Sequence, residues 1–352
     1  MALGRHHVGL LGRYFLHLKR QRLVWRSFRS RHRLVCVADR TGEIRREDIL
    51  AVVVLRNEAR RLPYFLNHYR ALGVAHFLVV DNASTDATAS LLADQPDVSL
   101  WRTSASYRAA RFGLDWANWL LMRYGHGHWC LTVDADELLV FAGHDTRGLP
   151  GLTADLDARG QQAFGALMLD MYPEQALGTG AADADPIQAA PWFDPGPYDA
   201  RRQAPMNNLW VQGGVRRRVF FSDTPESAPT LNKLPLVRWN RRWAYVNSTH
   251  ALLPSRLNMA YDGPDDTRPS GVLLHSKFLP EVVDKSAEDM SRQQHFHDPD
   301  AYRDYYAQIA TRPVLWSPQS VRYEGWQQLV ALGLMSPDAG ADSDDEQGSC
   351  NE

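Results

Sequence analysis

The sequence predicts an α/β fold with a mostly parallel central sheet and helices on both of its faces. Three observations support this class. Apolar runs of strand length alternate with segments of helical periodicity from residue 49 onward. These runs are continuous rather than alternating, which is typical of parallel strands covered on both faces. Polar and acidic residues stand where several runs end, at the edge where such sheets bind ligands.

The first part of the pattern has the order β-α-β-α-β-α-β. Strands are expected at 49–57, 76–82, 98–103 and 129–141, and helices at 61–73, 84–93 and 107–125. In the first helix, Leu62, Phe65, Leu66 and Tyr69 form one apolar stripe, and Gly73 supplies the stop. Repeated strand–helix–strand units imply right-handed crossovers in a parallel sheet.

The pattern loosens after about residue 145. Residues 178–205 are rich in Gly, Pro and Asp, so we expect a long loop that could act as a lid. Further strands are expected at 164–172, 215–221, 243–250 and 271–279, and helices at 281–293 and 299–311. The predicted organisation is a basic arm (1–46), the main domain (47–311), a helical extension (312–335) and an acidic disordered tail (336–352).

The two ends differ in charge, although the net charge is only −2. Residues 1–38 contain nine Arg or Lys and no acid, and Leu11, Phe15, Leu18, Trp25 and Phe28 follow near-helical spacing. This basic amphipathic helix could lie on an anionic membrane surface or pack as a solvated arm on its own domain. Nucleic-acid binding is not expected, because no recognition motif accompanies the charge.

No apolar run approaches the roughly 20 residues that cross a bilayer. The three cysteines, Cys36, Cys130 and Cys350, are widely separated and lack CxxC spacing. They predict neither a disulfide framework nor a zinc site, and favour a reducing cytoplasm. We therefore expect a cytoplasmic protein, at most peripheral at the inner face of the plasma membrane.

An acidic triplet, Asp134, Asp136 and Glu137, interrupts the apolar run "WCLTVDADELLVF". Carboxylates at alternate positions of a regular strand point to opposite faces, so a bend is expected there. Hard oxygen ligands suit Mg²⁺ or Mn²⁺ rather than zinc, and such an ion neutralises charge on a departing diphosphate. The alternative is a capped turn whose acids are solvated.

Rival classes can be weighed on the same residues. A dinucleotide-binding enzyme needs a glycine-rich turn after the first strand, but "LRNEARRLP" has no glycine. A phosphatase with an aspartyl nucleophile would carry its Asp-x-Asp after the first strand, not the fourth. A glycoside hydrolase needs no metal motif and fits the β-α order poorly.

The ordered motifs in residues 50–141 resemble the family 2 type of glycosyltransferases, in particular the subgroup with an Asn-Glu turn, a "DNxSxD" strand end and a "DxDE" motif. A weaker likeness continues through "GGVRRRVFF", "LNKLPLVRW", "STHALLP" and "LLHSKFL". The resemblance implies a GT-A fold and transfer of a sugar from a nucleotide diphospho-sugar. It is nearly silent about which sugar is transferred.

The resemblance also implies roles for individual residues. Asn57 and Glu58 match the turn that lines the nucleotide pocket, and Asp81 matches the acid that contacts the base or ribose. Asp86 matches a second acid of that motif or a helix N-terminal charge. Asp134 and Asp136 match the metal motif, and Glu137 would orient this motif or the acceptor.

Basic and histidine residues follow later in the chain. GT-A metal sites often take a later histidine, for which His275 is preferred over His250. Arg216, Arg217 and Arg218, with Lys233, could clamp the diphosphate or an acidic acceptor, although at least one of these arginines is expected to face solvent.

Inverting transfer also needs a carboxylate base. Asp170 is the first candidate because it ends an apolar strand, and the others are Glu174, Asp194 and Glu226. The resemblance implies a metal-dependent glycosyltransferase that inverts the anomeric carbon. It would move a sugar, preferably from a UDP-sugar, to a glycan or lipid-linked acceptor in surface polysaccharide synthesis. The alternative is a non-catalytic nucleotide-sugar-binding protein of the same fold.

Overall fold

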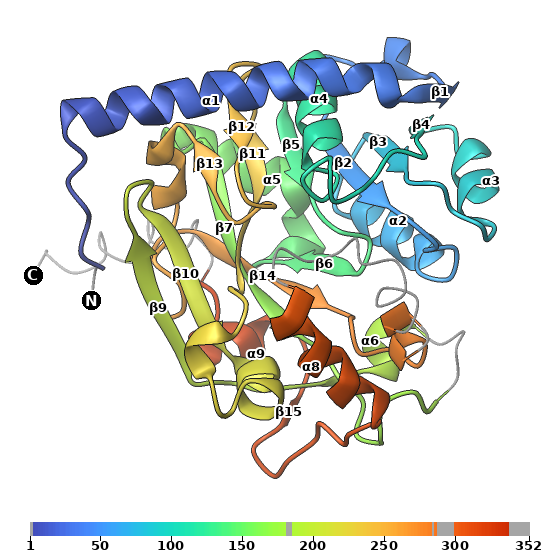
Figure 1. Ribbon diagram of the computed structural model, residues 1–352, viewed down its shortest axis with the longest axis vertical. Coiled ribbons are helices and arrows are strands. Elements are labelled where there is room, and N and C mark those ends of the chain that lie inside the picture. The colour runs from blue at the N-terminus through green and yellow to red at the C-terminus, as the bar shows by residue number, and fades with distance from the viewer. Residues whose placement is uncertain (1–2, 181–184, 284, 287–298, 338–352) are drawn as a thin grey trace, which may run out of the picture.

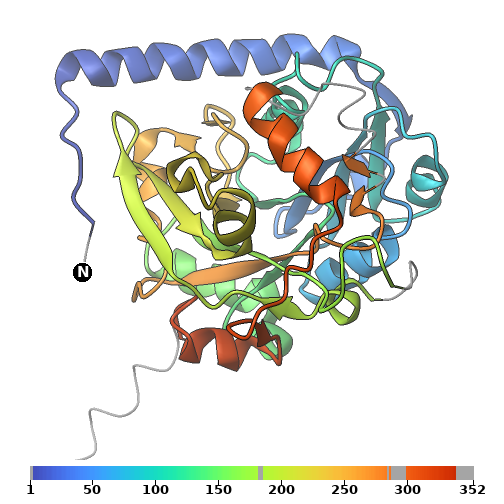
Figure 2. The same ribbon diagram turned by 60° about the horizontal axis from the view of Figure 1, so that its bottom comes forward.

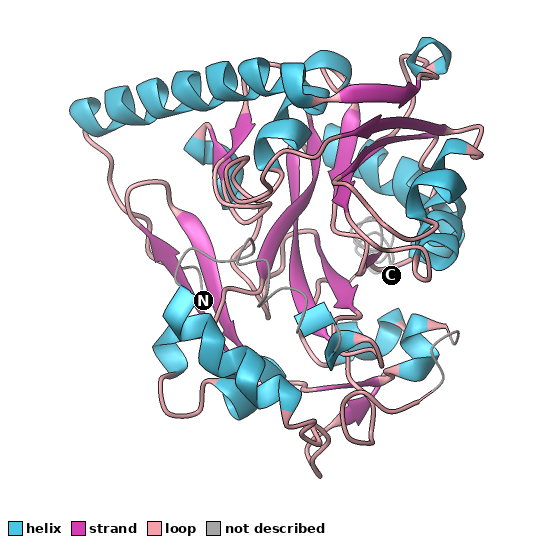
Figure 3. Cartoon of the chain, turned by 45° about the vertical axis from the view of Figure 1, so that its right-hand side comes forward, coloured by secondary structure: helices cyan, strands magenta, loops and turns pink. Residues whose placement is uncertain are grey.

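A computed structural model of the chain describes residues 3–180, 185–283, 285–286 and 299–337. Within them, nine strands form one central sheet (Figures 1 and 3). In spatial order they are β1 (Val35–Ala38), β4 (Val98–Arg102), β3 (His76–Asp81), β2 (Leu50–Leu55), β5 (Trp129–Thr132), β11 (Asn232–Arg238), β7 (Ala163–Asp170), β14 (Ser270–His275) and β6 (Glu137–Val140).

The central sheet is mixed but mostly parallel. Strands β4, β3, β2 and β5 are parallel to one another, and β14 is parallel to β7. Strand β11 is antiparallel to both β5 and β7, so β5 and β7 run in the same direction. The edge strands β1 and β6 are antiparallel to their partners. Six strands therefore present their carboxyl ends at one edge of the sheet.

Three small two-stranded sheets flank the central one. They pair β9 (Tyr198–Gln203) with β10 (Asn208–Gly213), β12 (Ala244–Tyr245) with β13 (Leu252–Leu253), and β8 (Trp192–Phe193) with β15 (Val321–Arg322).

Helices cover both faces of the sheet, as the sequence predicts. On one face, α2 (Leu62–Ala71) and α5 (His144–Ala158) pack on Ala51 and Val53 and their neighbours. On the other, α4 (Leu114–Tyr124) packs on Leu50 and Val52. Consecutive residues of β2 thus enter opposite cores, which explains why the whole strand is apolar. The remaining helices are α3 (Thr88–Ala93), α6 (Pro186–Ala189), α8 (Pro299–Ala310) and α9 (Trp326–Ala331).

Helix α1 (Leu10–Ser30) lies along the outside of the molecule, across α4 and the β12–β13 hairpin (Figures 1 and 2). Residues 35–38 of the predicted arm form β1, which pairs with β4. The central sheet therefore begins before residue 47. No described helix has both the length and the apolarity needed to cross a bilayer.

Several sequence expectations need correction. The run 129–141 is two strands, β5 and β6, which lie apart in the sheet. Asp134 and Asp136 lie in the turn between them, and Glu137 is the first residue of β6. Residues 215–221 form a π-helical turn, η3 (Arg216–Phe220), because the chain leaves β10 through Gly214 at a φ of 62°. The expected loop 178–205 contains β9, and only Ala244–Tyr245 of 243–250 is a paired strand.

The extension 312–335 contains β15 as well as the short α9. The acidic residues 338–352 and most of the predicted helix 281–293 lie outside the described residues.

Candidate functional site

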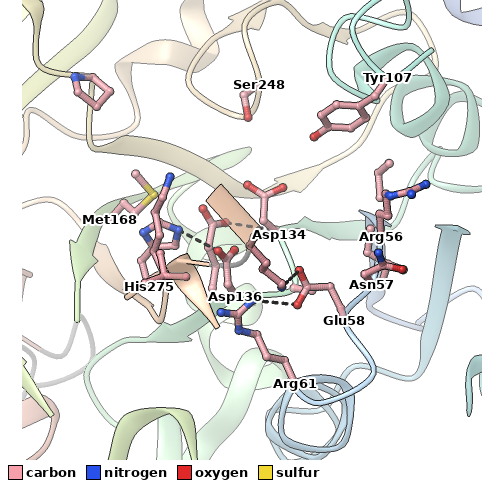
Figure 4. Close-up of a pocket in the computed structure, with 18 of the residues that line it drawn as sticks. Arg56, Asn57, Glu58, Arg61, Tyr107, Asp134, Asp136, Met168, Ser248 and His275 are labelled. Atoms are coloured by element: carbon pink, nitrogen blue, oxygen red, sulfur yellow. Dashed lines mark hydrogen bonds and ion pairs between the residues drawn. The ribbon is translucent and has the colours of Figure 1, made fainter. Parts of the chain in front are cut away.

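A cavity of about 440 Å³ lies at the carboxyl edge of the central sheet. The loops after β2 and β5, the end of β14 and the start of the antiparallel β11 all contribute to its wall. Figure 4 shows Asp134 and Asp136 between His275 on one side and Asn57 and Glu58 on the other. The charged residues of the wall are Arg56, Glu58, Arg61, Asp134, Asp136, Glu137, Arg216, Lys233, Lys277 and Lys285, with His250 and His275.

Asn57 joins the loops that follow β2 and β3. Its φ of 53° is left-handed, a conformation that Asn adopts more readily than most residues. Its backbone N–H donates to Ser84 Oγ at 2.9 Å, and its side-chain oxygen accepts from the Thr85 N–H at 2.8 Å. These bonds hold the loop after β2, which lines the cavity, against the loop after the neighbouring strand β3.

Lys233 holds the two outer acids of the triplet. Its Nζ lies 3.1 Å from Asp134 Oδ2 and 2.8 Å from Glu137 Oε1, and its side chain is almost fully buried. Glu137 is completely buried, whereas about half of the Asp134 side chain is exposed. Burial raises the pKa of Glu137 to about 7, against the opposing attraction of Lys233.

The central acid of the triplet faces a histidine. The ring nitrogens of His275 lie 3.2 Å from Asp136 Oδ2 and 2.6 Å from Asp170 Oδ1. Burial lowers the pKa of His275, but the two carboxylates outweigh it and raise the pKa above its ordinary value. Burial alone would raise the pKa of Asp136. The nearby His275 and Arg61 outweigh burial and hold this pKa well below its usual range.

Asp170 lies behind His275 and does not line the cavity. Arg216 binds the same carboxylate at 2.6 Å. Burial would raise the pKa of Asp170, but Arg216 and His275 bring it down to about 2. An ion-paired, almost fully buried carboxylate with so low a pKa is a weak base, so its geometry suits positioning of His275 rather than the predicted proton abstraction.

Glu58 belongs to a second charged cluster below the triplet. It pairs with Arg61 at 3.0 Å and with Lys285 at 2.8 Å, and Arg61 also pairs with Glu281 at 3.1 Å. Arg61 is almost fully buried and also donates to the Ser276 carbonyl. This cluster links the loop after β2 to the segment after β14.

The cavity brings together many of the residues predicted from the sequence. These are Asn57, Glu58, Asp134, Asp136, Glu137, Arg216, Lys233, His250 and His275. His250 lies in the wall, but its Nδ1 contacts the Asn232 carbonyl at 2.5 Å, and burial with nearby Lys233 lowers its pKa to about 3.

Other predicted residues do not line the cavity. Asp81 is fully buried and accepts hydrogen bonds from the Ser84 N–H and from Arg102. Asp86 lines a smaller neighbouring hollow of about 230 Å³. Arg218 pairs with Asp194, and Arg217 pairs with Asp199. Of the remaining base candidates, Glu174 and Glu226 are exposed and lie outside the wall.

The structure adds wall residues that were not singled out from the sequence. Arg61, Lys285, Tyr107 and Ser248 are among them. Arg61 follows Glu58 by three residues, a spacing at which side chains on a helical turn meet, so this pair could have been inferred. Lys285 is 227 residues from Glu58, and no local pattern reports that contact.

The donor set suits a hard divalent cation. Among the described residues, no three His, Cys, Asp or Glu side chains are already arranged around a metal position. Asp136 Oδ2 and His275 Nε2 are nevertheless 3.2 Å apart, close to the roughly 3 Å between adjacent ligands of an octahedral Mg²⁺ or Mn²⁺ ion. Asp134, the third ligand expected from the sequence, is about half exposed and pairs with Lys233.

The fold and the site together define a mixed α/β protein with a charged cavity at the carboxyl edge of its sheet. No protein-family model matches the chain, and no curated protein matches its sequence. Among solved structures, the chain is similar to a protein described as a glucose-1-phosphate thymidylyltransferase from Bacillus anthracis in complex with a sucrose. The identity is 6%, the match covers 74% of this chain and 83% of the other, and the TM-score is 0.28. A similarity of this degree carries no inference about activity.

Proposed function

We propose that the chain is a metal-dependent glycosyltransferase of the GT-A type. It moves a sugar from a nucleotide diphospho-sugar, preferably a UDP-sugar, to a glycan or lipid-linked acceptor in surface polysaccharide synthesis, with inversion at the anomeric carbon. The observation that carries this proposal is the contact of Asp136 with His275 beside the exposed Asp134, in a cavity whose wall is rich in cations. The motifs that resemble family 2 glycosyltransferases supply these same residues.

In this proposal, Asp134, Asp136 and His275 hold Mn²⁺ or Mg²⁺. The ion would neutralise the negative charge that grows on the departing nucleoside diphosphate. Asp170 and Arg216 keep the His275 ring in place by binding its far side. Lys277 and Lys285 provide positive charge in the same wall for the diphosphate oxygens.

The test is calorimetric titration of UDP and GDP, each with and without Mn²⁺. The wild type is compared with Asp134→Ala/Asp136→Ala and with the control Asp94→Ala/Asp223→Ala, whose two aspartates are exposed and outside the cavity. We expect metal-dependent binding of one nucleotide to the wild type and the control only. Binding that is indifferent to Mn²⁺ or to loss of the two acids would refute the metal site.

A second candidate is a nucleotide-sugar-binding protein of the same fold without turnover. This candidate is favoured because no carboxylate of the described wall is left to act as a base. Glu58 pairs with Arg61 and Lys285, and Glu137 pairs with Lys233. Asp134 and Asp136 are assigned to the ion. Hydrolysis of the nucleotide-sugar donor, abolished by Asp136→Asn, would select the enzyme. Tight binding without donor hydrolysis or transfer would select the binding protein.

A further inference from the structure

Helix α1 has two apolar faces, and the described residues of the domain cover one of them. The inner face packs Leu16, Leu23 and Val24 against Ala244 and Leu253 of the β12–β13 hairpin. Leu23 is buried by this contact. This face accounts for the attachment of the helix to the domain.

The outer face carries large apolar side chains with no covering element among the described residues. Leu11, Tyr14, Leu18 and Trp25 follow one another at steps of three, four and seven residues, which places them on one side of a helix. Their exposed fractions are 76%, 57%, 41% and 59%, and Leu10 and Phe15 beside them are 84% and 65% exposed. Tyr14 and Leu23 are nine residues apart, which at about 100° per residue puts them on opposite sides of α1.

Basic side chains flank this outer face. The helix contains Arg13, Lys19, Arg20, Arg22, Arg26 and Arg29 and no acid. Arg26 is anchored to Asp115, but no described acid pairs with Arg22 or Arg29, both of which are exposed. The whole chain has a net charge of −2, so this positive surface is a local feature. It would orient the molecule with α1 toward a negatively charged surface.

An apolar hollow of about 560 Å³ extends the outer face toward α4. Trp25 and Phe28 of α1 and Met122 of α4 line it, with Arg20 and Arg242 among its other residues. The apolar surface is therefore broader than one helical stripe and carries cations beside it.

We propose that the outer face of α1 docks on an anionic lipid bilayer. Its leucines and aromatic rings would enter the boundary between headgroups and acyl chains, while the flanking arginines meet lipid phosphates. Tyr and Trp are side chains that favour this boundary. A second copy of the chain fits the face less well, because a symmetric pairing would set one basic flank against another.

Helix α1 and one hairpin lie between the docking face and the cavity. Ala244 and Leu253 contact α1, and the turn between β12 and β13 supplies Ser248 and His250 to the cavity wall. Docking would therefore hold the cavity at a distance from the bilayer set by α1 and this hairpin. The proposal does not depend on glycosyl transfer, and its test contains no nucleotide.

The test is co-sedimentation of the full chain with vesicles of phosphatidylcholine alone or with 30% phosphatidylglycerol (about one lipid in three), at low and high salt. We expect binding to the anionic vesicles that weakens at high salt. Arg22→Gln/Arg29→Gln should lower the partition coefficient about 25-fold, since each cation near such a surface contributes roughly five-fold. Leu11→Ser/Leu18→Ser/Trp25→Ser should weaken binding at both salt concentrations, because it removes the inserting side chains.

Matched controls remove the same groups elsewhere. Arg159→Gln/Arg322→Gln and Leu91→Ser/Val314→Ser/Leu332→Ser change exposed residues outside α1 and should bind as the wild type does. Failure of the wild type to bind anionic vesicles at low salt would overturn the proposal, as would equal binding by all variants. A concentration-dependent dimer in light scattering that only the α1 apolar variant loses would instead assign the face to a second copy.

Discussion

Replacing Lys233 by Met should destabilise the protein through Glu137. The ammonium group is almost fully buried between Glu137, which is completely buried, and Asp134. Methionine preserves most of the aliphatic stem but leaves the Glu137 carboxyl without its cation. Removing one partner of a buried ion pair costs about 3–5 kcal/mol, and we take about 3 kcal/mol because Asp134 remains solvated.

Thermal unfolding of the metal-free protein at pH 7.5 measures this loss. For a chain of this length, an unfolding entropy of about 0.7 kcal/mol/K converts about 3 kcal/mol into a fall of about 4 °C in Tm. The double variant Lys233→Met/Glu137→Gln removes the charge together with its partner, so it should recover about half of the loss. The matched control is Arg238→Met/Asp157→Asn, which removes an exposed pair with a 2.6 Å contact and should shift Tm by less than about 1 °C.

The reasoning about Lys233 would be refuted by either of two results. One is a Tm of Lys233→Met that differs from the wild-type Tm by less than about 1 °C, which is roughly the effect of losing an exposed pair. The other is strict additivity of the Lys233 and Glu137 substitutions, which would mean that the two side chains do not stabilise one another.

Two further predictions concern the packing below the site. Burial lowers the pKa of His68 to about 4, while its Nε2 contacts the Leu139 carbonyl. The folded state therefore favours neutral His68 and loses stability as pH falls from about 6.5 toward 4. By linkage, the loss of stability between pH 7.5 and pH 5.0 in urea unfolding should be about 2 kcal/mol smaller in His68→Gln than in the wild type. An equal pH dependence in both proteins would contradict this assignment. A Cβ added to Gly165 would lie 1.9 Å from the Tyr261 ring, so Gly165→Ala should cost about 2 kcal/mol or more in the same assay, whereas Gly42→Ala, which meets open space, should be near neutral. Comparable losses in the two alanine variants would show that the Tyr261 contact is not the cause.

The sequence predicted those elements whose own residues reveal their surroundings. Residues 49–55 of the predicted strand are apolar at every position because β2 is covered on both faces, and the apolar stripe of 61–73 marks the buried side of α2. The position of a site at the carboxyl edge of the sheet could likewise be predicted, because polar residues follow the apolar runs. In contrast, 129–141 is compatible with one long strand or two short ones, because the pairing of β6 with β14 is made more than 130 residues later in the chain.

The site could be predicted as a set of residues but not as a set of contacts. Asp170 ends an apolar strand, which suggested a base, yet its depth behind His275 depends on β7 and β14 being neighbours. The partner of Glu137 is Lys233, which the sequence indicated only as a clamp for the diphosphate or an acidic acceptor. Contacts between strands so distant in the chain leave no periodicity or spacing to detect.

Lys233 also bears on how tightly the acidic triplet would hold a divalent cation. Its ammonium group already neutralises Asp134, the exposed donor of the proposed metal site. A metal ion and Lys233 would compete for this carboxylate and repel one another, since at about 4 Å two like charges interact by several kcal/mol at an effective dielectric constant of about 20. Lys233→Met should therefore bind Mn²⁺ more tightly than the wild type.

The same melting experiment measures this effect without any assay of activity. A ligand that binds only the folded state raises its stability in proportion to the logarithm of the ligand concentration over Kd. Mn²⁺ should thus raise the Tm of Lys233→Met more than that of the wild type, and Lys233→Met/Asp136→Asn should lose this response. Equal Mn²⁺ shifts in the wild type and Lys233→Met would mean that the ammonium group and the metal do not share Asp134, and the proposed position of the ion would then be wrong.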